Sequence, residues 1–230
     1  MTERWDDTIP PGVARVLLGF AVRQHAAAVD ADDAVVALEH RLATFFFAYG
    51  GFQARINEAY QQRLHQGRVH ADQEWRHRTP ERRLEALLGA REMSRRRRRL
   101  LRDVDEMWDS VTRPAALRVV KQMALDTPPD GPDRGGVRVL LETGPAYREE
   151  RYRPAALPAD VLSFEERHLR TCLLVMTEHL VLIERRFHPQ PPLHVRTDAG
   201  PMDIGDWFEA LRDGYTGPHA AFFDRIRLPR

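Results

Sequence analysis

Thr171–Ile183, with the sequence TCLLVMTEHLVLI, is the stretch that decides the fold. Its apolar residues recur every three or four positions, which predicts a helix, and further apolar residues fall on the other faces of that helix. A helix that is apolar nearly all round is surrounded by protein rather than by water. We therefore expect a central helix over residues 160–187, on which the other helices pack.

Residues at both ends of this stretch have the chemistry of helix boundaries. Asp160 or Ser163 can cap the first turn, and Ser163 with Glu166 has the spacing of a capping box. Pro189 ends the helix, because proline has no N–H and clashes with the preceding turn. The sequence thus predicts where the central helix begins and ends.

Length and composition are those of an ordinary globular protein. The 230 residues are enough for one large domain or two small ones, and 43% hydrophobic with 30% charged residues is typical of globular chains. A net charge of +1 favours neither nucleic acid nor membrane, and no apolar run approaches the roughly 20 residues that span a bilayer. The polar N-terminus is not a signal peptide, and the single cysteine, Cys172, favours a reducing cytosol.

The N-terminal half has the pattern of an antiparallel helical bundle over residues 11–126. A second helix is rich in aromatic residues, and we expect Gly50-Gly51 to kink or break it. Thr79-Pro80 marks a further helix start, because a capping Thr precedes Pro at the first position, and this helix is expected to run to Pro114. The first helix is expected to bury a stripe made of Val13, Val16, Leu17, Phe20 and Ala21.

The chain changes character at residues 127–136, a run dense in proline and glycine that we interpret as a linker or a long loop. Beyond it, residues 137–230 are predicted to form an α-rich region around helix 160–187 that shares a core with the N-terminal bundle. The fold class predicted is therefore mainly α, an antiparallel helical bundle with a C-terminal α-rich region.

Two short strands are a further expectation for the C-terminal region. Residues 137–141 and 193–197 are rich in β-formers. They either pair in parallel across the central helix through a right-handed crossover or lie unpaired as extended segments. Two short helices, Asp203–Arg212 and Pro218–Ile226, are predicted to follow.

The strongest charge feature is the run SRRRRR at Ser94–Arg99. Five consecutive helical positions go all the way round the helix axis, and a core cannot run through unpaired guanidinium groups. The run therefore either projects beyond the core or meets acidic groups from other segments. The candidate contacts for nucleic acid or for a partner are Arg91, Arg95, Arg96, Arg97, Arg98, Arg99 and Arg102.

Acidic neighbours weigh against a phosphate-binding role for this helix. Asp103, Asp105 and Glu106 follow the arginines directly and would repel a phosphate backbone laid along the same helix. Lys121 is the only lysine, and this skew toward arginine indicates a GC-rich bacterial genome rather than selection for each guanidinium. Nucleic-acid binding through the Arg91–Arg102 helix is therefore our second hypothesis.

Two Glu-x-x-His pairs, Glu74–His77 and Glu165–His168, have the spacing found in ferritin-like di-iron proteins. Such a site also needs a glutamate from each of two other helices, for which Glu39 and Glu106 are the candidates. Pairs of this kind arise by chance at about this frequency in a chain of this composition. A ferritin-like, metal-dependent enzyme is therefore the third hypothesis, and we expect no bound cofactor.

Short catalytic signatures are absent from the sequence, which contains no GxxxxGK, no GxSxG and no CxxC. The residues of Phe45-Phe46-Phe47 span about 200° of a helix, so one of them, Phe46 or Phe47, is expected outside the core at a partner surface. The leading hypothesis is a non-catalytic helical adaptor or regulatory protein of a bacterial cytoplasm. We expect it to bind another protein or a second copy of itself, and no membrane.

Overall fold

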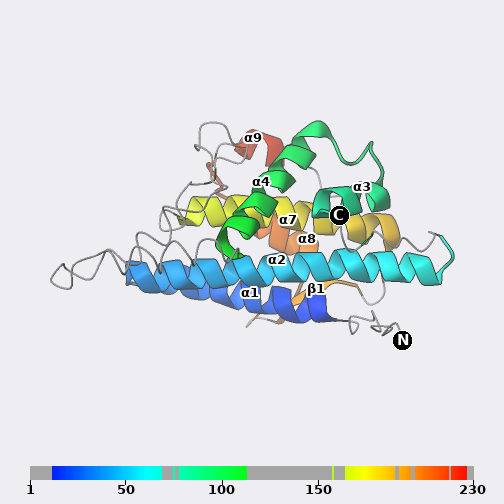
Figure 1. The fold of residues 1–230 in the computed structure, drawn as a ribbon. Helices are drawn as coiled ribbons and strands as arrows, with labels where there is room; N and C mark the ends of the chain where they lie inside the picture. Colours follow the sequence, from blue (N-terminus) through cyan, green and yellow to red (C-terminus); the bar gives the residue numbers. More distant parts are fainter. Residues whose placement is uncertain are drawn as a thin grey trace, which may run out of the picture.

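The computed structural model describes residues 12–68, 75, 78–112, 157, 164–189, 192–197, 200–217 and 219–226. As predicted, the described chain is mainly helical, with a small two-stranded sheet near the C-terminus (Figure 1). Its elements are α1 (Val13–Asp30), α2 (Ala34–His65), α3 (Pro80–Leu88), α4 (Arg95–Thr112), α7 (Glu166–Phe187), β1 (His194–Thr197), β2 (Gly200–Asp203), α8 (Ile204–Arg212) and α9 (Ala220–Phe223). The predicted linker 127–136 and the predicted strand 137–141 lie outside the described residues.

Helix α7 is the central helix that the sequence predicts. Fourteen of its 22 residues are buried, including every residue from Thr171 to Val181. Burial on all faces requires cover on all faces, and α2, α4 and α8 supply it. A buried Leu, Ile or Met side chain stabilises the fold by roughly 1.5–3 kcal/mol, so α7 contributes more to the core than any shorter helix.

Helix α7 begins at Glu166, six residues later than predicted. Phe164 and Glu165 precede the helix, and the ring of Phe164 packs edge-on against Phe45 with centroids 5.9 Å apart. The backbone N–H of Glu165 donates to Nδ1 of His168 at 3.0 Å and so closes the first turn. Asp160 and Ser163, the predicted caps, lie outside the described residues.

Helices α1 and α2 form an antiparallel hairpin along one side of α7 (Figure 1). The prediction of a kink at Gly50-Gly51 is wrong, because α2 continues through both glycines for 32 residues. A Cβ atom at Gly51 would lie 2.7 Å from Cγ of Leu18 and 3.2 Å from the carbonyl oxygen of Ala14. The glycine therefore allows α1 to approach α2 closely, which is a packing role rather than a bend.

The predicted long helix from Pro80 to Pro114 is in fact two helices. Thr79 caps α3 as expected, with its Oγ1 accepting the N–H of Arg82 at 3.4 Å, but α3 ends at Leu88 and Gly89 follows with φ +88°. Oγ of Ser94 accepts the N–H of Arg97 at 3.3 Å at the start of α4. Because the helix axis is broken, the arginines of α4 need not continue the apolar stripe of α3.

Strand β1 confirms the prediction for residues 193–197, and its partner within the described chain is β2. The two strands are antiparallel, with Val195 opposite Met202. Asp203 then caps α8, accepting the N–H of Gly205 at 2.7 Å, so the predicted helix 203–212 is confirmed within one residue. The last predicted helix, 218–226, is shorter in the structure, where α9 covers only Ala220–Phe223. No described helix is long and apolar enough to cross a bilayer.

The two adjacent glycines of α2 provide a matched test of the hairpin contact. Gly51→Ala should lower the free energy of unfolding by about 1–3 kcal/mol, because the new methyl group overlaps Leu18 and Ala14. Gly50→Ala meets only Cδ1 of Leu17 at 3.4 Å and should gain up to about 1 kcal/mol of helix propensity. Urea denaturation measures both, and equal stabilisation by the two changes would contradict the close approach of α1 and α2.

Candidate functional site

The arginine run of α4 meets carboxylates from other segments. Nη1 of Arg98 lies 2.7 Å from Oε1 of Glu85 in α3. Arg102 of α4 donates to both carboxylate oxygens of Glu81, which is also in α3, at 2.7 and 3.2 Å. These pairs are partly exposed, so each contributes about 0–1 kcal/mol. They fix α3 against α4 and neutralise two of the candidate phosphate contacts.

Arg97 makes the one buried ion pair in which this run takes part within the described chain. Its Nε donates to Oε1 of Glu178 at 2.7 Å, and its Nη1 donates to the carbonyl oxygen of Glu92 at 2.7 Å. The Glu178 side chain is 2% exposed and comes from the middle of α7. A buried carboxylate needs a counter-charge, so Arg97 is part of the core rather than a ligand-binding group.

Arg96 connects α4 to the C-terminal helix α9. Its guanidinium lies 4.5 Å from the ring centre of Phe222, which is a cation–π contact, and its Nη2 lies 3.1 Å from Nδ1 of His219. Burial, followed by the charge of Arg96, lowers the pKa of His219. A neutral His219 accepts this hydrogen bond, so Arg96 serves to hold α9 in place.

Among the candidate contacts, Arg91, Arg95 and Arg99 are left without a partner among the described residues. All three are exposed. Both outcomes expected for the run occur: some of its arginines project beyond the core, and others pair with acidic groups. What remains available to a ligand is three separate cations, Arg91 in the turn before α4 and Arg95 and Arg99 on α4, rather than a continuous basic helix.

The aromatic residues of α2 divide between the core and the surface. Phe45 is fully buried. Phe46 is half-buried and packs edge-on against Trp108, with centroids 5.2 Å apart. Phe47 is half-buried on the side of α1, where its ring lies 5.3 Å from the ring of Phe20. Of the two predicted surface candidates, Phe47 is the one beside an exposed aromatic residue.

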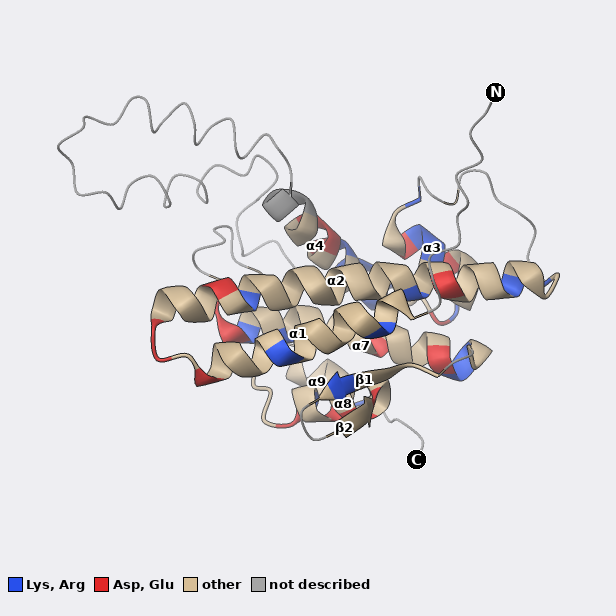
Figure 2. Ribbon diagram, turned by 90° about the horizontal axis from the view of Figure 1, so that it is seen from below, with Lys and Arg blue, Asp and Glu red and all other residues tan. Residues whose placement is uncertain are grey.

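The outer face of the α1–α2 hairpin, which we define by Val16, Phe20, Val36 and Phe47, is apolar and exposed. Val16, Phe20 and Val36 are 57, 40 and 42% exposed. The expectation that Val16 and Phe20 face the core is wrong, because Ala14, Leu18 and Ala21 fill that side of α1. Both sides of α1 are apolar, so periodicity alone does not identify the buried one. Figure 2 shows that the middle of α2, from residue 42 to residue 54, carries no Lys, Arg, Asp or Glu.

The metal-ligand candidates that the structure describes form no group able to hold a metal. Glu39 and Glu106 are exposed on α2 and α4. His168 is buried at the start of α7, where it accepts the N–H of Glu165. Glu74 and His77 lie outside the described residues. Across the described ranges, no three His, Cys, Asp or Glu side chains are grouped closely enough to hold a metal.

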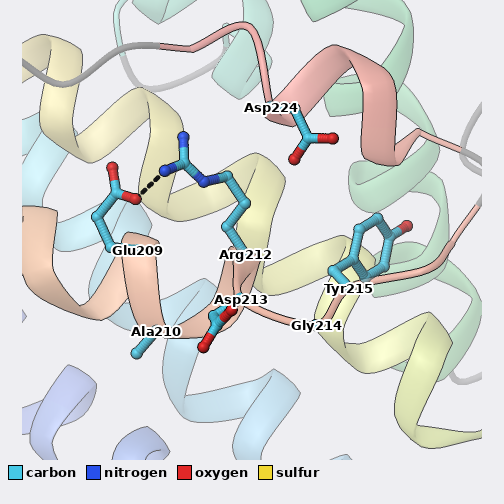
Figure 3. A pocket seen from close by; sticks show the side chains of 7 residues that line it. All are labelled: Glu209, Ala210, Arg212, Asp213, Gly214, Tyr215 and Asp224. Carbon is cyan, nitrogen blue, oxygen red and sulfur yellow. Dashed lines mark hydrogen bonds and ion pairs between the residues drawn. The ribbon is translucent and has the colours of Figure 1, made fainter.

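A hollow of about 540 Å³ opens between α8 and α9 (Figure 3). The residues that line it are Glu209, Ala210, Arg212, Asp213, Gly214, Tyr215 and Asp224. Arg212 pairs with Glu209 and donates to the carbonyl oxygen of Ile226 at 2.8 Å. The Tyr215 hydroxyl is hydrogen-bonded to Thr171 at 2.7 Å, and burial raises its pKa. These lining side chains include no Ser, Cys, Thr or Lys that could act as a nucleophile beside a base.

A second hollow, of about 450 Å³, lies where α2, α3 and α4 meet. Tyr49 donates to Asp105 and stacks on Trp108 with ring centroids 4.4 Å apart. Nη1 of Arg83 donates to Oε1 of Gln53 at 3.0 Å. Burial lowers the pKa of Arg83, and the charges of Tyr49 and Asp105 oppose that shift. The polar groups bond one another across three helices, which is a structural role.

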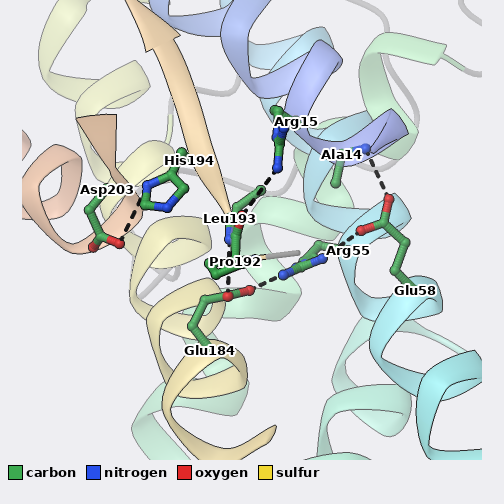
Figure 4. A network of polar contacts seen from close by, with 9 residues as sticks. All are labelled: Ala14, Arg15, Arg55, Glu58, Glu184, Pro192, Leu193, His194 and Asp203. Atoms are coloured by element: carbon green, nitrogen blue, oxygen red, sulfur yellow. Dashed lines mark hydrogen bonds and ion pairs between the residues drawn. The ribbon is translucent and has the colours of Figure 1, made fainter. Parts of the chain in front are cut away.

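Figure 4 shows a buried clamp centred on Arg55, which was not among the residues predicted from the sequence. Arg55 donates from Nε to Glu184 at 2.7 Å and from Nη1 to Glu58 at 2.8 Å. Glu58 also accepts the N–H of Ala14 at 3.2 Å, and Glu184 accepts the N–H of Leu193 at 3.2 Å. Burial opposes the charged form, but the two carboxylates outweigh it and raise the pKa of Arg55. Only the Arg55–Glu58 spacing of three residues was visible in the sequence.

His179 is a fully buried titratable group in α7. Its Nδ1 lies 2.7 Å from the carbonyl oxygen of Val175, and its ring packs edge-on against Phe52. Nε2 is buried and has no hydrogen-bond partner among the described residues. Burial lowers the pKa of His179, Glu178 and the Val175 carbonyl oppose that shift, and Arg97 adds to it. The residue is therefore neutral in the folded protein at neutral pH, as expected for a core histidine.

The buried ion pair gives a prediction with a control on the same helix. Arg97→Gln should lower the free energy of unfolding by about 3–5 kcal/mol, because it leaves the Glu178 carboxylate buried without a counter-charge. Arg99→Gln removes an exposed charge and should change stability by less than about 0.5 kcal/mol. Adding Glu178→Gln to Arg97→Gln should restore part of the loss. Equal urea midpoints for the two single variants would contradict this role of Arg97.

The burial of His179 predicts a loss of stability in acid. Its pKa lies below the ordinary 6.5 in the folded state, so from about pH 6.5 downward the unfolded chain binds a proton more readily. The free energy of unfolding should therefore decrease as the pH is lowered through this window, by up to about 1.4 kcal/mol per pH unit for one proton. Denaturation at about pH 7.5 and about pH 5.5 measures the effect. His179→Gln should flatten the difference, and the exposed control His65→Gln should not.

Comparison of the chain with protein-family models, with curated proteins and with solved structures found no match.

Proposed function

We propose that this chain is a non-catalytic helical interaction protein of a bacterial cytoplasm, and that a second copy of the chain packs on its outer α1–α2 face. The observation that carries the proposal is the exposure of Val16, Phe20 and Val36 on one face of a two-helix hairpin. Large apolar side chains gathered on one exposed face are typical of a protein–protein interface.

The geometry of the face supports docking of another helical hairpin. Val16 and Phe20 lie about 40° apart around α1, and Val36 and Phe47 lie about 20° apart around α2. The four residues therefore form two parallel rows rather than a scatter. The Phe20–Phe47 ring contact joins the rows. Arg23 lies about 20° from Val16 around α1, and its guanidinium lies 4.7 Å from the ring centre of Phe20.

The charges around the face favour a second copy as the occupant. Asp30, Asp32 and Asp33 gather at the α1–α2 turn, whereas Arg15 lies near the opposite end of α1 and Arg23 lies near its middle (Figure 2). A twofold axis that lies in the interface, at right angles to the helix axes, places the acidic turn of each copy over the Arg15 end of the other. Isologous dimers of this kind are the commonest protein oligomers, and opposite charges at the rim steer and orient association.

The size of the face is adequate for such a dimer. Helix α1 has 18 residues, so it is about 27 Å long, and two helices of about 10 Å diameter make a face about 20 Å wide. This footprint, on the order of 500 Å², approaches the roughly 800 Å² of accessible surface that each partner buries in a standard interface. A four-helix arrangement of two hairpins would bury the whole apolar face.

Sedimentation equilibrium of the full chain at micromolar concentration tests this proposal. We expect a dimer for the wild-type chain and a monomer for Phe20→Glu or Val16→Glu, because an unpaired carboxylate would enter the apolar centre of the interface. Val29→Glu is the matched control. Val29 is 65% exposed on the same helix but lies about 140° around it from Val16, so this variant should remain a dimer.

Circular dichroism separates loss of association from loss of folding, since all three altered residues are exposed. A wild-type chain that stays monomeric at high concentration would refute docking of a second copy. So would equal loss of association in the Val29→Glu control. A dimer that survives both Phe20→Glu and Val16→Glu would place the interface on another surface.

Nucleic-acid binding through α4 is the second candidate function, and the exposure of Arg91, Arg95 and Arg99 favours it. Three arginines neutralise at most three phosphates. The logarithm of the affinity would then fall with the logarithm of salt concentration with a slope no steeper than about −3. Such binding would be weak at physiological salt, which is why we rank it below protein association.

A further inference from the structure

Helices α2 and α7 end side by side at one end of the molecule (Figure 1). The guanidinium of Arg63, in the last turn of α2, lies 4.6 Å from the ring centre of Phe187, the last residue of α7. Stacking on an aromatic ring holds a guanidinium in one plane and leaves its donor edge available to a ligand. The same contact places Arg186, which precedes Phe187, at this end of the bundle.

The end of α2 adds a third arginine through its backbone geometry. Gly67 has φ +65°, its N–H donates to the carbonyl oxygen of Leu64 at 3.0 Å, and the N–H of Arg68 donates to the carbonyl oxygen of Arg63 at 2.9 Å. This pair of bonds is a Schellman motif, which requires a residue in the left-handed region and favours Gly there. The motif folds the backbone of Arg68 back over the turn that carries Arg63.

These three arginines, which we call the end cluster (Arg63, Arg68 and Arg186), have no carboxylate partner in the described chain. Glu58 and Glu184 are the acidic residues of the clamp in the same helices, and donors from Arg55 and the backbone occupy all four of their oxygens. Nε of Arg63 is buried without a hydrogen-bond partner among the described residues. Burial lowers the pKa of Arg63, and the charges of Arg68 and Arg186 lower it further.

The net charge around the end cluster remains positive after the nearby negative groups are counted. Each helix C-terminus carries about half a negative charge, so the ends of α2 and α7 together offset about one guanidinium. The clamp has two carboxylates and one arginine and offsets a second. The end cluster therefore keeps about one net positive charge, concentrated at the surface where Arg68 and Arg186 are exposed.

We propose that the end cluster binds the phosphate groups of a small, multiply phosphorylated ligand of the diphosphate type. Guanidinium groups bind phosphate oxygens through paired, charge-assisted hydrogen bonds. Three of them at the ends of two adjoining helices match a compact polyanion. A nucleic-acid backbone, in contrast, needs cations spaced along a groove or a helix. The proposal does not depend on the proposed dimer, because it uses none of the residues of the outer α1–α2 face.

Isothermal titration calorimetry of the full chain with inorganic pyrophosphate tests the proposal. We expect saturable binding that weakens with added salt. Arg68→Gln combined with Arg186→Gln should reduce the affinity about tenfold or more, since each charge-assisted hydrogen bond lost is worth about a factor of ten. Both residues are exposed, so the variant should keep its melting temperature without ligand. Arg95→Gln combined with Arg99→Gln removes the same charge from α4 and is the matched control.

Each other outcome decides against the proposal. Absence of pyrophosphate binding by the wild-type chain would overturn it, and so would an equal loss in both double variants, because bulk charge would then account for the effect. A single-stranded oligonucleotide that binds more tightly than pyrophosphate, and that depends on Arg68 and Arg186, would assign the cluster to a polymer. Phe20→Glu should bind pyrophosphate normally, which keeps this test separate from that of the dimer.

Discussion

The burial of α7 on every side is the constraint on which the rest of the structure depends. A helix in this position needs neighbours on all of its faces, so segments from both ends of the chain must meet around it. The fully buried carboxylate of α7, Glu178, also needs a counter-charge, and Arg97 supplies it from α4. The apolar faces of α7 thus recruit α2 and α8, and its charge determines which residue of α4 points inward.

Features set by neighbouring residues in the chain, such as helix periodicity and helix starts, were predicted correctly from the sequence. The periodicity around Leu173 and Leu180 identified α7, the cap at Thr79 marked the start of α3, and the helix predicted over 203–212 matches α8 within one residue. Gly51 was misjudged because a glycine that bends a helix and one that admits a neighbouring helix look identical in sequence. The choice depends on Leu18, 33 residues earlier, and no short-range pattern contains that contact.

The candidate sites were harder to predict, for the same physical reason. The arginine run is evident in the sequence, but its partners Glu81, Glu85 and Glu178 lie on two other helices rather than among the acidic residues that follow it. The end cluster joins Arg63 to Arg186 across 123 positions of sequence. Only its Arg63–Arg68 half, built around Gly67, follows from a recognisable helix-end motif.

The Arg55 clamp has a consequence for the order in which the chain is made. Ala14, Arg55 and Glu58 leave the ribosome early, whereas Glu184 and Leu193 come more than a hundred residues later. Until then the α1–α2 hairpin has only half of its polar anchor and exposes Phe45, Phe52 and Ile56 to water. For most of its synthesis the nascent protein therefore exposes the apolar surface of a two-helix intermediate. Such a surface is prone to aggregation and is the kind that cellular chaperones bind.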